Sequence, residues 1–202
     1  EAKKKAGKFN ATIGIATENG VPMYISSMRT LFSDELKPSE IFPYSPMGGV
    51  HALREKWLEE MRIKNPLLEG KSISLPIVTS GLTSSVSIAA SLFLDKNDTV
   101  VLPDMYWENY NLILTEQRQA NIVPYPFFKE GGFNTERLSQ AIDSDTTGKV
   151  FVFLNFPNNP TGYSPTEEEA DEITRVLVSK AERGKKILVM CDDAYFGLFF
   201  DR

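Results

Sequence analysis

The sequence predicts an α/β fold, with a three-layer α/β/α arrangement around a mainly parallel β-sheet. Short apolar runs of strand length recur along the chain. Amphipathic segments long enough for helices separate these runs, an alternation typical of crossover units and parallel sheets. The 202 residues are 42% hydrophobic and 24% charged, as in an ordinary soluble globular protein, and they suffice to bury a core.

The N-terminal part of the chain differs from the rest. Up to residue 43 the sequence has no clear periodicity, and Gly7, Gly14, Gly20 and Pro22 interrupt its short apolar pieces. We therefore expect an N-terminal arm over residues 1–43 and a more regular domain over residues 44–202. The first regular element is an amphipathic helix over residues 50–62. Its apolar positions are Val50, Leu53, Trp57, Leu58 and Met61.

Strands and helices are predicted to alternate over the rest of the chain. The predicted strands are residues 75–79, 99–102, 122–125, 150–154 and 187–191, and the predicted helices are residues 84–94, 107–119, 135–143 and 165–183. The last helix has the firmest start, with Ser164 as N-cap, Pro165 at the first helical position and Glu167 closing a capping box.

Composition excludes several classes of function. The net charge is −5 and the only basic cluster lies at the extreme N-terminus, which argues against a nucleic-acid partner. The apolar runs are too short to span a bilayer, so no membrane partner is expected. Cys191 is the single cysteine and no Cys/His cluster has zinc spacing, so we expect no metal site and a reducing, cytoplasmic location.

Ligands of an open parallel sheet bind beyond the carboxyl ends of its strands, so the residues after each run are the candidates for a site. "TSGLTSS" follows the 75–79 run, and its turn and helix start suit a phosphate group. A serine-rich helix cap without a ligand is the alternative. "PDMYWENYN" follows the 99–102 run, where Trp107 or Tyr106 offers a ring face and Tyr110 a phenol, unless these rings belong to the core.

The next two strand ends carry amides and carboxylates. "NFPNNPTG" ends the 150–154 run, and "CDDAYFG" ends the 187–191 run. Successive strand residues point to opposite faces, so only one of Asp192 and Asp193 is expected to face a ligand. The four strand ends together describe a pocket for a flat, phosphorylated, protonatable heterocycle.

The motif "NNPTG", followed at the expected distance by Asp192, Ala194 and Tyr195, resembles the pyridoxal-phosphate-dependent aminotransferases of fold type I, class I/II, in their aspartate aminotransferase branch. "GIATENGVP", "YSPMGGVHALR", "TSGLTSS" and "WENY" resemble further blocks of that family. The resemblance implies that residues 44–202 are the N-terminal portion of the large cofactor-binding domain and that residues 1–43 include part of the small domain.

The resemblance also implies roles around the cofactor, pyridoxal 5′-phosphate. Asp192 pairs with the protonated pyridine nitrogen, which makes the ring a better electron acceptor. Tyr195 and Asn159 bond the 3′ oxygen, and Trp107 stacks on the ring. The phosphate is bound by Leu82, through its backbone N–H, and by Thr83.

Further implied roles concern the partner subunit and the substrate. Tyr44 reaches the phosphate of a partner subunit, so a homodimer with shared active sites is expected. Ile15 and Ala16 approach the substrate, although Ala16 stands where the family commonly has glycine. Asn158 stands where the aspartate branch often has histidine, so the amino acid and 2-keto acid substrates are not specified.

The implied activity is a ping-pong transamination between an amino acid and a 2-keto acid. The resemblance places the Schiff-base lysine and the arginine that binds the substrate carboxylate beyond Arg202, so the chain is expected to be an N-terminal half that is inactive alone. Two alternatives stay open: a pyridoxal-phosphate-dependent lyase or decarboxylase of the same fold, and a catalytically inactive homologue.

Overall fold

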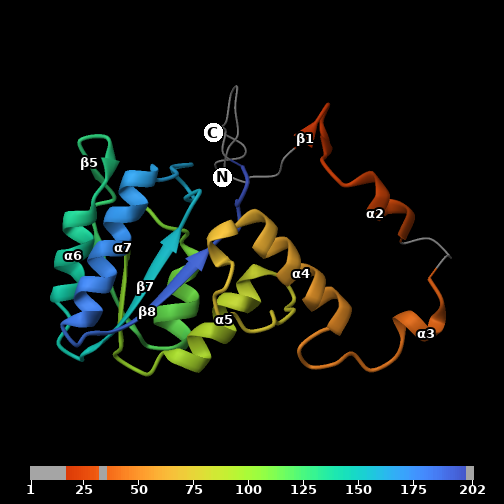
Figure 1. The fold of residues 1–202 in the computed structure, drawn as a ribbon, viewed down its shortest axis with the longest axis horizontal. Coiled ribbons are helices and arrows are strands. Elements are labelled where there is room, and N and C mark those ends of the chain that lie inside the picture. Colours follow the sequence, from red (N-terminus) through yellow and green to blue (C-terminus); the bar gives the residue numbers. More distant parts are fainter. Residues whose placement is uncertain (1–16, 32–35, 199–202) are drawn as a thin grey trace. The chain divides into compact units, whose positions relative to one another are not determined.

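The computed structural model describes residues 17–31 and 36–198 (Figure 1). The chain divides into two compact units, one up to Pro76 and the other from Ile77, and each is described by itself. The expected domain boundary between residues 43 and 44 concerns a complete subunit and stays a prediction.

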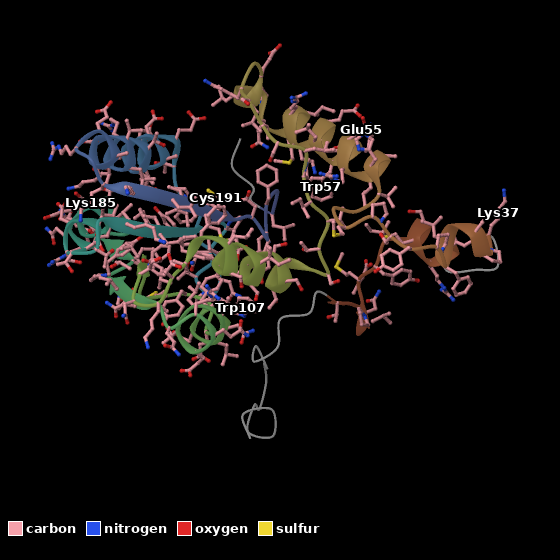
Figure 2. The ribbon with its side chains drawn as sticks, turned by 90° about the horizontal axis from the view of Figure 1, so that it is seen from below. Lys37, Glu55, Trp57, Trp107, Lys185 and Cys191 are labelled. Carbon is pink, nitrogen blue, oxygen red and sulfur yellow. The ribbon has the colours of Figure 1, made fainter. Side chains whose placement is uncertain are left out.

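The first unit contains short elements and one long helix. Strands β1 (Thr17–Glu18) and β2 (Val21–Pro22) form an antiparallel pair. They are followed by helices α2 (Ser26–Leu31), α3 (Pro38–Ile41) and α4 (His51–Lys64) and by the 3₁₀ turn η1 (Pro66–Leu68). Helix α4 confirms the helix predicted at residues 50–62. None of the residues of α4 is buried, and the side chain of Trp57 (Figure 2) is 61% exposed.

The predicted strand at residues 75–79 is wrong. The segment has no regular secondary structure and pairs with no strand among the described residues. The Arg54 guanidinium of α4 donates instead to the carbonyls of Leu75 and Pro76. The carbonyl of Thr79 accepts the N–H of Gly81 in a turn. An apolar run becomes a strand only where a neighbouring backbone pairs with it, and these carbonyls have other donors.

The second unit is built on a four-stranded parallel sheet in the order β4-β3-β7-β8. Its strands are β3 (Thr99–Pro103), β4 (Asn121–Tyr125), β7 (Lys149–Asn155) and β8 (Lys186–Asp192). Four of the five predicted strands are thereby confirmed within one or two residues. A small antiparallel hairpin, β5 (Phe128–Lys129) with β6 (Gly132–Phe133), was not predicted.

Helices cover both faces of this sheet, which confirms the α/β fold. Alternate strand residues point to opposite faces. Phe151 and Phe153 of β7 pack in one core with helix α5 (Leu82–Phe93) and the π-type helix η2 (Asn111–Gln117). Val150 and Val152 pack in the other core with helices α6 (Thr135–Asp143) and α7 (Glu167–Glu182), which lie side by side (Figure 1).

The start of helix α6 lies where the sequence predicts it, whereas the start of α7 lies two residues later than predicted. Helix α6 has the predicted bounds and is capped by Asn134, whose side chain accepts the N–H of Arg137. The cap predicted for α7 at Ser164 is wrong, because Thr166 and Glu169 form the capping box two residues later. Glu169 also accepts the hydroxyl of Tyr163 and the N–H of Phe133. The bond from Phe133, in the distant β5–β6 hairpin, favours Glu169 as the third residue of the helix.

A buried carboxylate stabilises the amino-terminal end of the sheet. Asp145 accepts the hydroxyl of Thr99 at 2.6 Å, the N–H groups of Thr147 and Gly148, and the ammonium group of Lys185 at 3.1 Å. Burial raises the pKa of Asp145, but these hydrogen bonds outweigh it and hold the pKa well below its usual value. Asp145 therefore ties the starts of β3, β7 and β8 together as a carboxylate.

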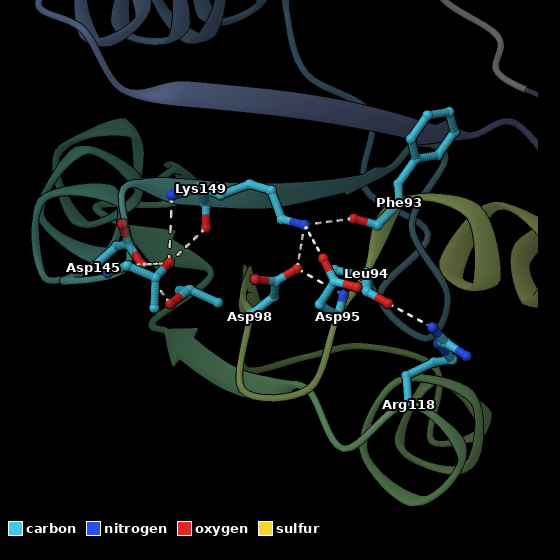
Figure 3. A network of polar contacts seen from close by, with 9 residues as sticks. Phe93, Leu94, Asp95, Asp98, Arg118, Asp145 and Lys149 are labelled. Carbon is cyan, nitrogen blue, oxygen red and sulfur yellow. Dashed lines mark hydrogen bonds and ion pairs between the residues drawn. The ribbon is translucent and has the colours of Figure 1, made fainter.

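A second ionic contact lies beside it. The ammonium group of Lys149 contacts Asp98, Asp95 and the carbonyl of Phe93 (Figure 3). This cation joins the first residue of β7 to the loop between α5 and β3.

We expect Asp145→Asn to lower the free energy of unfolding of the complete protein by about 1–3 kcal/mol at pH 7, because it leaves buried donors without a charged acceptor. The folded-state pKa of Asp145 lies below the unfolded one. Its contribution is therefore full above the ordinary aspartate pKa of about 3.9 and is lost as the pH falls towards the folded value. Urea unfolding of both proteins between pH 7 and pH 3 measures the difference.

The control is Glu136→Gln. The pKa of Glu136 is also lowered, by its hydrogen bond to Lys129, but both side chains are exposed, so the change is expected to matter little. Equal effects of the two substitutions would contradict the role assigned to Asp145.

Candidate active site

The carboxyl ends of the parallel strands meet at a small cavity of about 130 Å³ within the second unit. This is the end of an open α/β sheet where ligands bind. The cavity is lined by Leu82, Trp107, Tyr110, Asn155, Asn159, Asp192, Ala194 and Tyr195. These residues come from the start of α5, the turn after β3, the end of β7 and its loop, and the end of β8.

Asp192 is the last residue of β8 and is only 3% exposed. Its Oδ2 accepts the hydroxyl of Tyr110, and its Oδ1 accepts the N–H of Ala194 at 3.1 Å. Burial raises the pKa of Tyr110, and the bond to Asp192 raises it further, so this phenol stays protonated as a donor. The next residue, Asp193, is exposed and does not line the cavity.

The loop after β7 is held by two asparagines with separate partners. Asn155 accepts the N–H of Asn159 at 2.7 Å and donates to the carbonyl of Asp192 at 2.9 Å. Asn158 accepts the N–H and the hydroxyl of Thr161 and donates to the carbonyl of Met105. Asn158 thus shapes the turn, while Asn159 lines the cavity.

Aromatic rings form one side of the cavity. Trp107 meets Tyr110 edge to face with ring centroids 5.5 Å apart, and Tyr110 packs on Phe153 at 4.6 Å. Tyr106 donates its hydroxyl to Asn111 at 2.8 Å and does not line the cavity. Of the two rings that the sequence offered for stacking, Trp107 therefore has access to a ligand.

The start of helix α5 supplies backbone donors. Gly81 has φ of 87° and ψ of 168°, a conformation that a residue with a side chain rarely adopts. No side chain caps this helix end. The first N–H groups and the positive end of the helix dipole are therefore available to an anion beside Leu82, which lines the cavity.

The structure brings together five of the residues to which the resemblance gives roles: Leu82, Trp107, Asn159, Asp192 and Tyr195. Thr83 is the second residue of α5 but does not line the cavity. Tyr44 lies in the first unit with a fully exposed side chain. Ile15 and Ala16 lie outside the described residues.

The sequence did not predict two features of the site. One is the hydrogen bond from the phenol of Tyr110 to Asp192. The other is the role of Asn155, which bonds the backbone of both Asn159 and Asp192. The available signals were a polar residue closing the apolar run "FVFL", and the spacing of three between Trp107 and Tyr110, which places both on one side of a helical turn.

Within residues 17–31 and 36–198, no group of three His, Cys, Asp or Glu side chains is placed to hold a metal ion. No helix there combines the length and apolar character needed to cross a membrane.

Comparisons with known proteins show the family to which the chain belongs. Residues 21–202 match the family model described as aminotransferase class I and II. A probable aspartate/prephenate aminotransferase of Aquifex aeolicus is 33% identical over 155 residues, which cover 75% of this chain and 36% of that protein. An aspartate aminotransferase of a Bacillus species, strain YM-2, is 28% identical over 159 residues, covering 78% and 38%.

A solved structure extends the match to nearly the whole chain. The crystal structure of an aminotransferase from Anaerococcus prevotii has a TM-score of 0.81 and 30% sequence identity, and the match covers 95% of this chain and 48% of that one. The chain thus spans less than half the length of the relatives that it matches. The chain belongs to the class I and II aminotransferase family.

Proposed function

We propose that the complete protein carrying this chain is a transaminase that moves an amino group between an amino acid and a 2-keto acid by a ping-pong mechanism. Members of this family use pyridoxal 5′-phosphate as cofactor. The observation that carries the proposal is the convergence of Asp192, Asn159, Tyr195 and Trp107 on one cavity beside the start of α5.

The donors and acceptors around the cavity fit this cofactor. A carboxylate has about four acceptor sites on its two oxygens. Tyr110 and Ala194 occupy two of those of Asp192, which leaves capacity to accept the N–H of a protonated pyridine ring. When bound, the cofactor supplies an electron-accepting ring for the pair of electrons released at the substrate α-carbon.

We assign a role in cofactor binding to five of the lining residues and to Thr83. Asp192 holds a proton on the ring nitrogen, which favours electron acceptance. Asn159 and Tyr195 donate hydrogen bonds to the 3′ oxygen, and Trp107 covers one ring face. Leu82 and Thr83 bind the phosphate at the uncapped start of α5.

The remaining site assignments are also proposals for the complete protein. We assign Tyr44 to the phosphate of a partner subunit in a homodimer, and Ile15 and Ala16 to the substrate. The Schiff-base lysine is assigned to chain beyond Arg202, and the location to the cytoplasm. We also propose that residues 1–43 form an arm and part of the small domain, and that residues 44–202 form part of the large domain.

The test uses the complete protein with pyridoxal 5′-phosphate. We expect absorbance titration to show stoichiometric binding, and we expect an amino acid to yield its keto acid only when a 2-keto acid acceptor is present. Aspartate is the first donor to try, because two of the relatives are named for it. Product formed without any acceptor would favour a lyase or decarboxylase. Binding without turnover of any amino acid would indicate an inactive homologue.

A further inference from the structure

We infer that Asn155 is a positioning residue that fixes Asn159 and Asp192 relative to one another in the cofactor site. The inference rests on the proposed function, since it assumes that these two residues contact the same cofactor ring. It gives a role to a cavity residue whose two side-chain hydrogen bonds both go to the backbone of neighbouring site residues.

The geometry places Asn155 between the two residues. Asn155 ends β7 and is the register partner of Asp192, the last residue of β8. Its side chain accepts the backbone N–H of Asn159 and donates to the backbone carbonyl of Asp192. The residue is only 7% exposed, so water competes poorly for either bond.

The two partners demand a side chain of one particular kind. A backbone N–H is only a donor and a backbone carbonyl only an acceptor. The residue between them must accept with one atom and donate with another at a fixed separation, as a carboxamide does. An aspartate keeps the acceptor but loses the donor, and an alanine loses both.

The bridge formed by Asn155 affects two contacts of the bound cofactor ring. Asp192 is assigned to the pyridine nitrogen and Asn159 to the 3′ oxygen, and these groups belong to one rigid ring. The two residues come from different strand ends, so the side chain that bridges them controls whether both contacts form together. Loosening the bridge is therefore expected to weaken binding of the ring while leaving the phosphate end at α5 unchanged.

The experiment compares wild type with Asn155→Asp and Asn155→Ala in the complete protein. For the apoprotein, we measure the Kd for pyridoxal 5′-phosphate by absorbance titration and the Kd for inorganic phosphate by competition. We expect Kd for the cofactor to rise about tenfold, or about 1.4 kcal/mol, with Kd for phosphate unchanged. If Asn155→Ala fails to fold, the equal-sized Asn155→Asp carries the test.

The matched control is Thr99→Val, which removes a buried hydrogen bond to Asp145 at the opposite end of the sheet. We expect it to lower the melting temperature without changing either Kd. Wild-type cofactor affinity in both Asn155 variants would overturn the inference, as would an equal loss of cofactor and phosphate affinity. A wild-type protein without affinity for the cofactor would instead overturn the proposed function.

Discussion

Replacing Asp192 by alanine is expected to reduce the turnover of the complete protein by several orders of magnitude while leaving most of its folding intact. The carboxylate lines the cavity and is the assigned partner of the cofactor nitrogen. Without it the ring nitrogen loses its proton, and the ring accepts electrons less readily. Each tenfold loss in kcat corresponds to about 1.4 kcal/mol of transition-state stabilisation. Steady-state kinetics with saturating cofactor measure the effect.

Asp193→Ala is the matched control, since it removes a neighbouring carboxylate that is exposed and does not line the cavity. We expect its turnover to stay near that of wild type. A large loss in Asp193→Ala together with a small loss in Asp192→Ala would refute the assignment of the two strand positions. The buried hydroxyl of Tyr110 loses its acceptor in Asp192→Ala, so thermal unfolding of both variants separates lost chemistry from lost stability.

Replacing Phe153 by alanine is expected to lower the free energy of unfolding by about 3–5 kcal/mol, as large-to-small changes of buried aromatic residues do. Phe153 is 1% exposed and packs against Tyr110 and Phe151. Because Tyr110 donates to Asp192, the cavity left behind also loosens the support of the site. Urea unfolding measures the free energy of unfolding, and titration with pyridoxal 5′-phosphate measures the affinity of the site for the cofactor.

Leu92→Ala provides the comparison, because it removes a large apolar side chain that is 71% exposed on α5. A surface change of this kind is expected to stay within about 0.5 kcal/mol. If Phe153→Ala cost no more than Leu92→Ala, the core between α5, η2 and β7 would not be the stabilising layer described above.

Much of the second unit was predictable because its signals are local. The apolar runs around Val101, Val123, Val152 and Val189 have strand length and are bounded by polar or turn residues, and all four are strands of the parallel sheet. Helix α6 was predicted with its observed bounds from its amphipathic run.

The errors arose where distant residues compete for the same backbone. The run at residues 75–79 is as apolar as a strand, yet Arg54 binds its first carbonyls. The cap of α7 was predicted at Ser164, but the hydrogen bond from Phe133 to Glu169 favours the later cap at Thr166. Neither outcome can be derived from the local sequence, because the deciding partner lies elsewhere in the chain.

The sequence by itself determined the parallel α/β architecture of this unit and the strand ends that carry Trp107, Asn159, Asp192 and Tyr195. It did so because hydrophobic periodicity fixes the strands, and parallel strands present their carboxyl ends at one edge. Tertiary structure alone decided how these residues are held. The bonds of Tyr110 and Asn155 to Asp192 join segments far apart in sequence, so they exist only once the strands have paired.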